Sequence, residues 1–98
     1  MRYAFRKSDL QRLHDMEDGS EAYPPEVVTR FFTVIGIISA AQDLRDIRAN
    51  KALRLEKLKG RRNNQHSLRL NNQWRLVIEL EKQADGTMIW IIEIADYH

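Results

Sequence analysis

The sequence of 98 residues lacks the features that mark several large functional classes. It contains no cysteine, which excludes disulfide bonds and thiolate metal sites and is typical of a reducing compartment. Its three histidines do not have the spacing of metal ligands, and no phosphate-binding loop, nucleophile elbow or dinucleotide-binding motif is present. These absences argue against a classical metalloenzyme, kinase or hydrolase, and we expect neither a metal nor a cofactor.

Long apolar segments are missing as well. The longest nearly apolar run, residues 31–41, is about half of the roughly 20 residues that a membrane-spanning helix needs. The N-terminal residues 1–6 contain no apolar signal core. We therefore expect a cytoplasmic protein without membrane contact, in which residues 1–98 form a single small domain around a thin core.

Positive charge is concentrated in the middle of the chain. The segment 51–75 contains eight lysines and arginines and one acid, Glu56, for a formal charge of +7; since the whole chain is +2, the remainder is −5. A dense basic segment on a small domain is typical of proteins that bind a polyanion, because each phosphate contact releases counterions. The alternative is a basic surface that contacts only solvent.

The first half of the sequence predicts one short strand and two helices. Residues 2–6 alternate as a strand, and Ser8-Asp9-Leu10-Gln11 has the pattern of a capping box. We expect that box to begin a helix that ends near Gly19. A second helix is expected from the Pro24-Pro25 pair to about Gln42, because its apolar residues recur every three or four positions.

After an expected charged connection over residues 43–51, the apolar period changes to two, which predicts strands. A three-residue turn at Asn71-Asn72-Gln73 would place six residues on one face: His66, Leu68, Leu70, Trp74, Leu76 and Ile78. This register puts Arg69 directly opposite Arg75. Like charges in such a position repel unless an anion lies between them, and we interpret the pair as a phosphate clamp.

The pattern as a whole predicts an α+β fold. Asp85-Gly86 is expected to turn the chain into a final strand. The architecture is then two N-terminal helices packed on a curved, mainly antiparallel sheet of four to five strands.

Individual polar residues in the second half each have a structural and a functional interpretation. Glu56 is either a general base or the ion-pair partner of a nearby cation. Lys59, which precedes Gly60, is either a ligand-binding lysine at the end of a strand or a surface lysine at a turn. His66 shares a face with two leucines, so we interpret it as a partly buried structural histidine. Both tryptophans are expected in the core and not as platforms for stacking bases.

The sequence ends with an acid, a phenol and an imidazole, Asp96-Tyr97-His98, directly after a strongly apolar, strand-like run. Chain ends usually fray. A rigid sheet that extends to this point would instead hold three side chains that can transfer protons.

Three segments together resemble one family. They are LEKLKGRR (55–62), QHSLRLNNQWRL (65–76) and IADYH (94–98), and in order and spacing they are similar to the HigB-type ("plasmid maintenance system killer") toxins of the RelE/ParE superfamily. The resemblance covers about residues 54–98 and extends more loosely to Phe5 and the two predicted helices.

The resemblance implies a RelE-like fold with a basic concave face. It also implies the toxin of a type II toxin–antitoxin system, acting as a ribosome-dependent mRNA endonuclease in the A site, next to 16S rRNA of the 70S ribosome. The cognate antitoxin of such a toxin is typically a HigA-like helix-turn-helix protein.

Site residues are implied position by position. The family's active-site positions match Lys59, Arg75, Asp96, Tyr97 and His98, and Glu56 stands where many members have histidine and others glutamate. The neighbouring cations expected to contact RNA are Lys57, Arg61, Arg62 and Arg69. Arg61 and Asn64 replace an acid and a glycine that are common in the family, which changes the loop that faces RNA.

The implied chemistry is metal-independent attack of the RNA's own 2′-hydroxyl on the adjacent phosphorus. Such a reaction needs a proton acceptor, a proton donor and cations on the phosphorane. We assign charge stabilisation to Lys59 and Arg75 with support from Arg69. His98 is the preferred acid, Glu56 or Asp96 the base, and Tyr97 stacks on or orients a nucleobase.

Two other functions fit the same charge pattern. A ParE-like inhibitor of DNA gyrase would use the basic face for protein or DNA contacts and would not need the terminal triad. A non-catalytic RNA-binding module would bind RNA in a salt-sensitive way without arresting growth.

Overall fold

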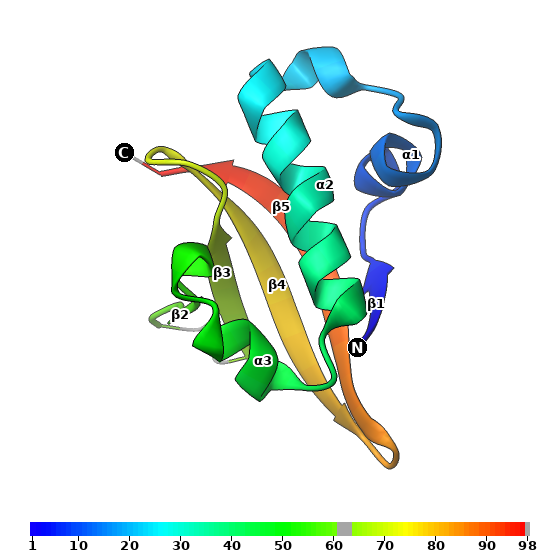
Figure 1. Cartoon of the computed structure of the whole chain (residues 1–98). Coiled ribbons are helices and arrows are strands. Elements are labelled where there is room, and N and C mark those ends of the chain that lie inside the picture. Colours follow the sequence, from blue (N-terminus) through cyan, green and yellow to red (C-terminus); the bar gives the residue numbers. More distant parts are fainter. Residues whose placement is uncertain (61–63, 98) are drawn as a thin grey trace.

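The computed structural model describes residues 1–60 and 64–97 and shows a five-stranded sheet with helices on one side (Figure 1). The strand order is β1-β5-β4-β3-β2. The strands are β1 (Arg2–Phe5), β2 (Glu56–Lys57), β3 (Gln65–Arg69), β4 (Trp74–Gln83) and β5 (Gly86–Asp96). Neighbouring strands are antiparallel except β1, which pairs with β5 in parallel. The predicted α+β class and the mainly antiparallel sheet are confirmed.

The helix α2 (Pro25–Ala40) covers the middle of the sheet, as predicted from its apolar period. Its buried residues recur at three- and four-residue spacing: Val27, Phe31, Val34, Ile35 and Ile38. They pack in one core with the buried leucines and isoleucines of β3, β4 and β5. The helix α1 (Ser8–Met16) adds Leu10 and Leu13 to this core from the side of β1. No helix in the described ranges is long and apolar enough to cross a membrane.

The helix α1 begins at Ser8 as predicted, but the local structure at each of its ends differs from the prediction. Ser8 is the first helical residue and Lys7 occupies the N-cap position without a side-chain hydrogen bond, so no capping box forms. The helix also stops before Gly19, because Glu17 adopts a left-handed conformation (φ 54°) and its N–H donates to the Leu13 carbonyl at 3.0 Å. A left-handed C-cap without glycine gave no signal in the sequence.

The predicted connection over residues 43–51 was also wrong, because it contains the short helix α3 (Leu44–Ala49) and the 3₁₀ turn η2 (Lys51–Leu53). The Asp43 carboxylate accepts a hydrogen bond from the N–H of Arg45 at 2.9 Å and caps α3. Ile47 is fully buried and fastens the helix to the core. A second 3₁₀ turn, η1 (Ser20–Ala22), precedes α2.

The hairpin between β3 and β4 has the predicted register. Leu68 pairs with Leu76, and Arg69 lies opposite Arg75 across a three-residue turn. The side chain of Asn71 holds this turn, since its Oδ1 accepts from the N–H groups of Gln73 and Trp74 at 2.8 and 2.7 Å. The face that was predicted to be buried therefore packs beneath α2.

The two tryptophans have different environments. Trp74 packs against the core, as predicted, and its ring meets Tyr23 edge to face. The prediction for Trp90 was wrong, because it alternates with the buried Ile89 and Ile91 and faces away from the helices. There the guanidinium of Arg6 lies 4.1 Å from the centre of its ring.

A β-bulge in β5 decides which way the end of the sheet faces. Val77 pairs with Glu93 but the next residue, Ile78, pairs with Ile91, so one residue of β5 is left over. The extra residue shifts the alternation, and Glu93 and Ala95 now lie on the side of the sheet opposite the helices. Tyr97 continues this alternation, and its N–H donates to the Gln73 carbonyl at 2.6 Å.

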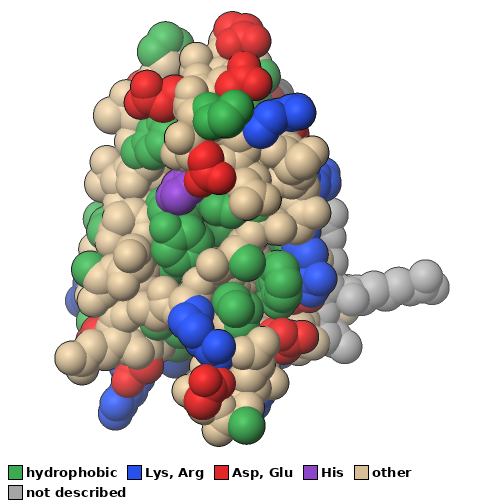
Figure 2. Space-filling view, turned by 90° about the vertical axis from the view of Figure 1, so that its right-hand side faces the viewer, with side chains coloured by type: hydrophobic (Ala, Val, Ile, Leu, Met, Phe, Trp, Pro, Cys, Tyr) green, Lys and Arg blue, Asp and Glu red, His purple; other side chains and the backbone are tan. Residues whose placement is uncertain are grey.

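The side of the molecule that carries α1 and β1 has no dominant charge. Figure 2 shows hydrophobic side chains at the centre of this side, with acidic and basic side chains of both signs scattered around them. A single-sign surface for a polyanion is therefore not found on this side.

Replacing Asn71 with alanine tests the turn that aligns the two arginines. Losing two backbone hydrogen bonds is expected to lower the free energy of unfolding by about 1–2 kcal/mol in urea denaturation. Gln11→Ala, which removes an exposed amide on α1, is the control and should change it by less than about 0.5 kcal/mol. Equal losses from both variants would show that Asn71 does not hold the turn.

Candidate active site on the outer face of the sheet

The sheet side opposite the helices, called the outer face below, collects most of the described candidate residues. Its members, read from the pairing register, are Glu56, Ser67, Arg69, Arg75, Val77, Glu93 and Ala95. Glu56 lies across from Ser67 on β3, which lies across from Val77 on β4. Residues from four strands therefore meet at this end of the sheet.

Arg75 is the most firmly held side chain of the outer face. Its Nε donates to Ser67 Oγ at 2.7 Å, and its Nη2 donates to the Arg54 carbonyl at 2.5 Å and the Ser67 carbonyl at 3.3 Å. Only 14% of the side chain is exposed. Arginine has five N–H donors, and the two on Nη1 have no hydrogen bond to any described residue. The guanidinium is thus fixed in orientation and keeps donors for an anion.

The acceptor at Arg54 depends on an unusual backbone conformation. Arg54 has φ 45° and ψ 58°, in the left-handed region that residues with a side chain rarely adopt. It follows η2, and Leu53, the last residue of that turn, is fully buried. Leu53 therefore anchors the turn that precedes Arg54, and the Arg54 carbonyl accepts a hydrogen bond from the Arg75 guanidinium.

Glu56 lies beside Arg75 but does not form a close ion pair with it. Its Oε2 is 4.0 Å from Arg75 Nη2, at the limit of an ion pair, and 58% of its side chain is exposed. An exposed pair at this distance contributes little stability. The carboxylate is therefore next to a fixed cation and still accessible to a proton donor from solution.

Arg69 and Arg75 are opposite each other, but their guanidinium groups bind different acceptors. Arg69 donates to Asn72 Oδ1 in the turn, whereas Arg75 reaches back to Ser67 and Arg54. The repulsion between the two arginines is relieved in this way without an anion between them. A phosphate clamp would require Arg69 to leave Asn72.

The end of β5 is tied to the turn of the hairpin. The Gln73 side chain donates from Nε2 to Asp96 Oδ2 at 3.2 Å, and the Gln73 carbonyl accepts from the Tyr97 N–H. By strand alternation Asp96 points to the helix side of the sheet, like Ile94 two residues before it. Tyr97 points to the outer face, like Ala95, and has 37% of its surface exposed. The structure thus brings Tyr97, and not Asp96, to the side of Arg75.

Other predicted residues are not brought to the outer face. Lys57 is next to Glu56 but pairs with His66, so it points to the helix side of the sheet. Lys59 lies in the turn after β2, is exposed, and contacts no described acid. Arg61, Arg62 and His98 lie outside the described residues. The described residues contain no cluster of three or more histidines or acids that could hold a metal ion.

His66 is half-buried on the helix side, in agreement with its interpretation as a structural histidine. Its Nδ1 is buried and has no hydrogen-bond partner among the described residues. Burial lowers the pKa of His66 below 6.5, and the positive charges of Lys57 and Arg48 lower it further, against an opposing effect of the Asn64 backbone. The imidazole is therefore kept neutral in a cationic environment.

Sequence reasoning missed Ser67 and the Arg54 carbonyl. Ser67 is 1% exposed although it lies on the outer face, because the Arg75 side chain lies over it. A single serine between apolar strand residues gives no signal. Only the register, which makes Ser67 the diagonal neighbour of Arg75, identifies it.

Comparison with known proteins places the chain in a family of toxins. The family model described as "RelE-like toxin of type II toxin-antitoxin system HigB" matches residues 3–98. A solved structure described as "YoeB/ParE toxin from Agrobacterium tumefaciens" is similar with a TM-score of 0.59 and 14% sequence identity, covering 100% of both chains. At this identity the likeness shows the fold alone, and it confirms the RelE-like fold. No curated protein sequence matches the chain.

The contact between Ser67 and Arg75 can be tested through stability. Ser67→Ala leaves a nearly buried guanidinium donor without its acceptor, and we expect a loss of about 1–3 kcal/mol in the free energy of unfolding. Ser39→Ala, on the exposed side of α2, should change stability by less than about 0.5 kcal/mol. A Ser67 variant as stable as the Ser39 control would contradict the contact.

The lowered pKa of His66 predicts a pH dependence of stability. In the unfolded chain the imidazole takes a proton near pH 6.5, whereas in the folded protein it stays neutral to a lower pH. The unfolded state then binds more protons, so this contribution is present above pH 6.5 and is lost as the pH falls below it. Urea denaturation between about pH 7.5 and 5.5 should show a steeper loss for the native sequence than for His66→Gln. Parallel curves would contradict the shift.

Proposed function

Because the chain belongs to the HigB family of RelE-like toxins from type II toxin–antitoxin systems, we propose that it is a ribosome-dependent endoribonuclease. It cleaves mRNA in the A site of the 70S ribosome and so inhibits translation and growth. As a type II toxin it has a cognate antitoxin. We propose a HigA-like helix-turn-helix protein for that partner and 16S rRNA as a further contact of the toxin on the ribosome.

The observation that supports this proposal most strongly is the anchored guanidinium of Arg75 beside an exposed carboxylate. Arg75 is fixed by Ser67 and the Arg54 carbonyl while its Nη1 donors stay available. Charge that is oriented before the reaction needs no rearrangement as the phosphorane forms, and such preorganised charge often contributes more to catalysis than any other single effect. Ser67 and the Arg54 carbonyl are thus positioning groups that act through Arg75.

The reaction proposed for the outer face transfers the phosphoryl group of the RNA from the 5′-oxygen of one nucleotide to the 2′-oxygen of the preceding one. The 2′-oxygen bonds to phosphorus as its proton passes to a base. The bond to the 5′-oxygen then breaks as an acid protonates the leaving oxygen, leaving a 2′,3′-cyclic phosphate and a free 5′-hydroxyl. Each proton-transfer group contributes roughly 10²–10⁴-fold.

Among the candidate bases the geometry favours Glu56 over Asp96. Glu56 lies on the outer face, within 4.0 Å of Arg75, and is largely exposed. Asp96 points to the helix side and accepts a hydrogen bond from Gln73. Tyr97 is placed to stack on or orient a nucleobase, and Lys59 adds positive charge at the end of β2. His98 remains the acid expected from the sequence.

Primer extension on an mRNA incubated with the purified protein, with and without 70S ribosomes, tests the proposal. We expect cuts at defined codon positions only when ribosomes translate. Arg75→Gln should lower the cleavage rate about 10²–10³-fold, whereas Arg12→Gln, an exposed arginine on α1, should leave it unchanged. Deleting His98 should abolish cleavage and leave the fold intact.

Other outcomes would replace the proposal. Growth arrest without RNA cleavage would indicate the ParE-like inhibition of gyrase, and salt-sensitive RNA binding without arrest would indicate a binding module. Full activity of Arg75→Gln would contradict the site assignment even if the ribosome-dependent cleavage is found.

A further inference from the structure

A polar concavity lies on the helix side of the sheet, whereas Glu56 on β2 points to the outer face. It has a volume of about 670 Å³ between the edge of the sheet and α3. The cavity is lined by Arg48, Lys57, Asn64, His66, Glu79, Leu80, Glu81 and Lys82. None of the groups assigned above to the chemical step belongs to it. We call it the His66 pocket.

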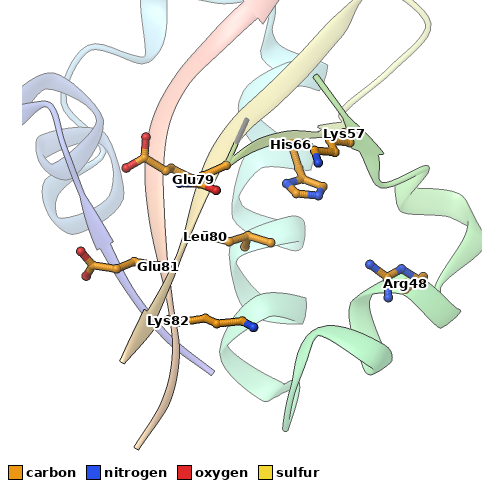
Figure 3. Close-up of a pocket in the computed structure, with 8 residues that line it drawn as sticks. Arg48, Lys57, His66, Glu79, Leu80, Glu81 and Lys82 are labelled. Atoms are coloured by element: carbon orange, nitrogen blue, oxygen red, sulfur yellow. The ribbon is translucent and has the colours of Figure 1, made fainter. Parts of the chain in front are cut away.

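The labelled side chains of Figure 3 that lie on the pocket side of the sheet are basic or apolar. Figure 3 shows His66, Leu80 and Lys82 on the same side of the sheet, with Arg48 facing them from α3. The carboxylates of Glu79 and Glu81 extend to the opposite side, in agreement with strand alternation. Three cations therefore surround the hollow without an acid directed into it.

The acids near the pocket have partners elsewhere, whereas the cations of the pocket have none among the described residues. Glu79 binds Arg6 at 2.8 Å on the outer face, and Glu81 accepts from Gln83 at 2.9 Å. In contrast, the three cations Arg48, Lys57 and Lys82 form no ion pair or hydrogen bond with any described residue. Unpaired like charges in one hollow repel one another, and an anion between them removes that repulsion.

We propose that the His66 pocket binds a phosphate group, and that its source is the backbone of the RNA whose neighbouring part lies on the outer face. The donors suit a phosphate, since arginine and lysine nitrogens and the Asn64 amide can point at its oxygens. Leu80 supplies an apolar floor between them. This inference rests on the proposed function, because RNA is the ligand in both.

The position of β2 favours RNA over an acidic protein segment. This strand has only two residues and forms the edge of the sheet, so Glu56 faces the outer face and its neighbour Lys57 faces the pocket. A polynucleotide that is bound at Arg75 and extends over β3 to Glu56 passes around the short edge strand β2 to place another phosphate in the pocket. RNA thus contacts both surfaces without a second partner.

Binding can be measured on the purified full chain without ribosomes, which separates this inference from cleavage. The probe is a short single-stranded RNA with 2′-O-methyl groups, which has no 2′-hydroxyl to attack. The logarithm of its affinity should fall with the logarithm of salt concentration, and the slope should decrease by roughly 0.7 in Lys82→Gln for the one phosphate lost. Lys7→Gln, an exposed lysine that makes the same change in net charge, is the matched control.

The NMR signals of the His66 ring report the pocket directly in the unmutated protein. Saturable shifts with RNA and not with inorganic phosphate identify the RNA backbone as the source. Shifts with inorganic phosphate that RNA competes away support the site and show that it also takes the free ion. If neither probe moves His66, or if Lys82→Gln and Lys7→Gln change the salt slope equally, the site is wrong. Shifts with polyglutamate and not with RNA would overturn it in favour of an acidic protein partner.

Discussion

The hydrogen bonds that fix Arg75 are the constraint on which the outer face depends. A guanidinium at the end of a strand has many rotamers, and three hydrogen bonds to Ser67 and the Arg54 carbonyl select one of them. Those acceptors come from different elements: Ser67 from β3, and Arg54 from the turn that a buried Leu53 anchors. Because Leu53 packs in the core, the core positions the Arg54 carbonyl that accepts a hydrogen bond from Arg75 on the outer face.

The β-bulge in β5 makes the second contribution to the geometry of the site. Without the extra residue, Glu93, Ala95 and Tyr97 would point toward the helices, and the chain end would not face Arg75. Strand alternation also separates the two residues of β2. Glu56 points to the proposed cleavage site on the outer face, and Lys57 points to the His66 pocket on the helix side. The short edge strand β2 therefore lies between two polar surfaces, and the described cations Arg75 and Lys57 of the basic segment lie on opposite sides of the sheet.

Much of the fold follows from the sequence, because periodicity and burial agree over long elements. The 16-residue helix α2 and the register of the hairpin at Asn71-Asn72-Gln73 are examples, and the register placed Arg69 opposite Arg75 correctly. The errors concern short segments whose alternative backbone conformations differ little in free energy. Examples are the end of α1 at Glu17 and the helix α3 capped by Asp43. Within the site, Glu56 and Arg75 were named from the family resemblance, and no local pattern predicted their approach to 4.0 Å. Ser67, the Arg54 carbonyl and the bulge are visible only in three dimensions.

A double-mutant cycle on cleavage tests most directly whether the outer face works through an anchored Arg75. Single-turnover rates on programmed ribosomes would be compared for the native sequence, Ser67→Ala, Arg75→Ala and the double variant. If Ser67 acts by holding Arg75, Ser67→Ala slows cleavage in the native background and has no further effect once Arg75 is absent, a coupling of about 0.5–3 kcal/mol. Independent, multiplicative losses from the two substitutions would contradict this account.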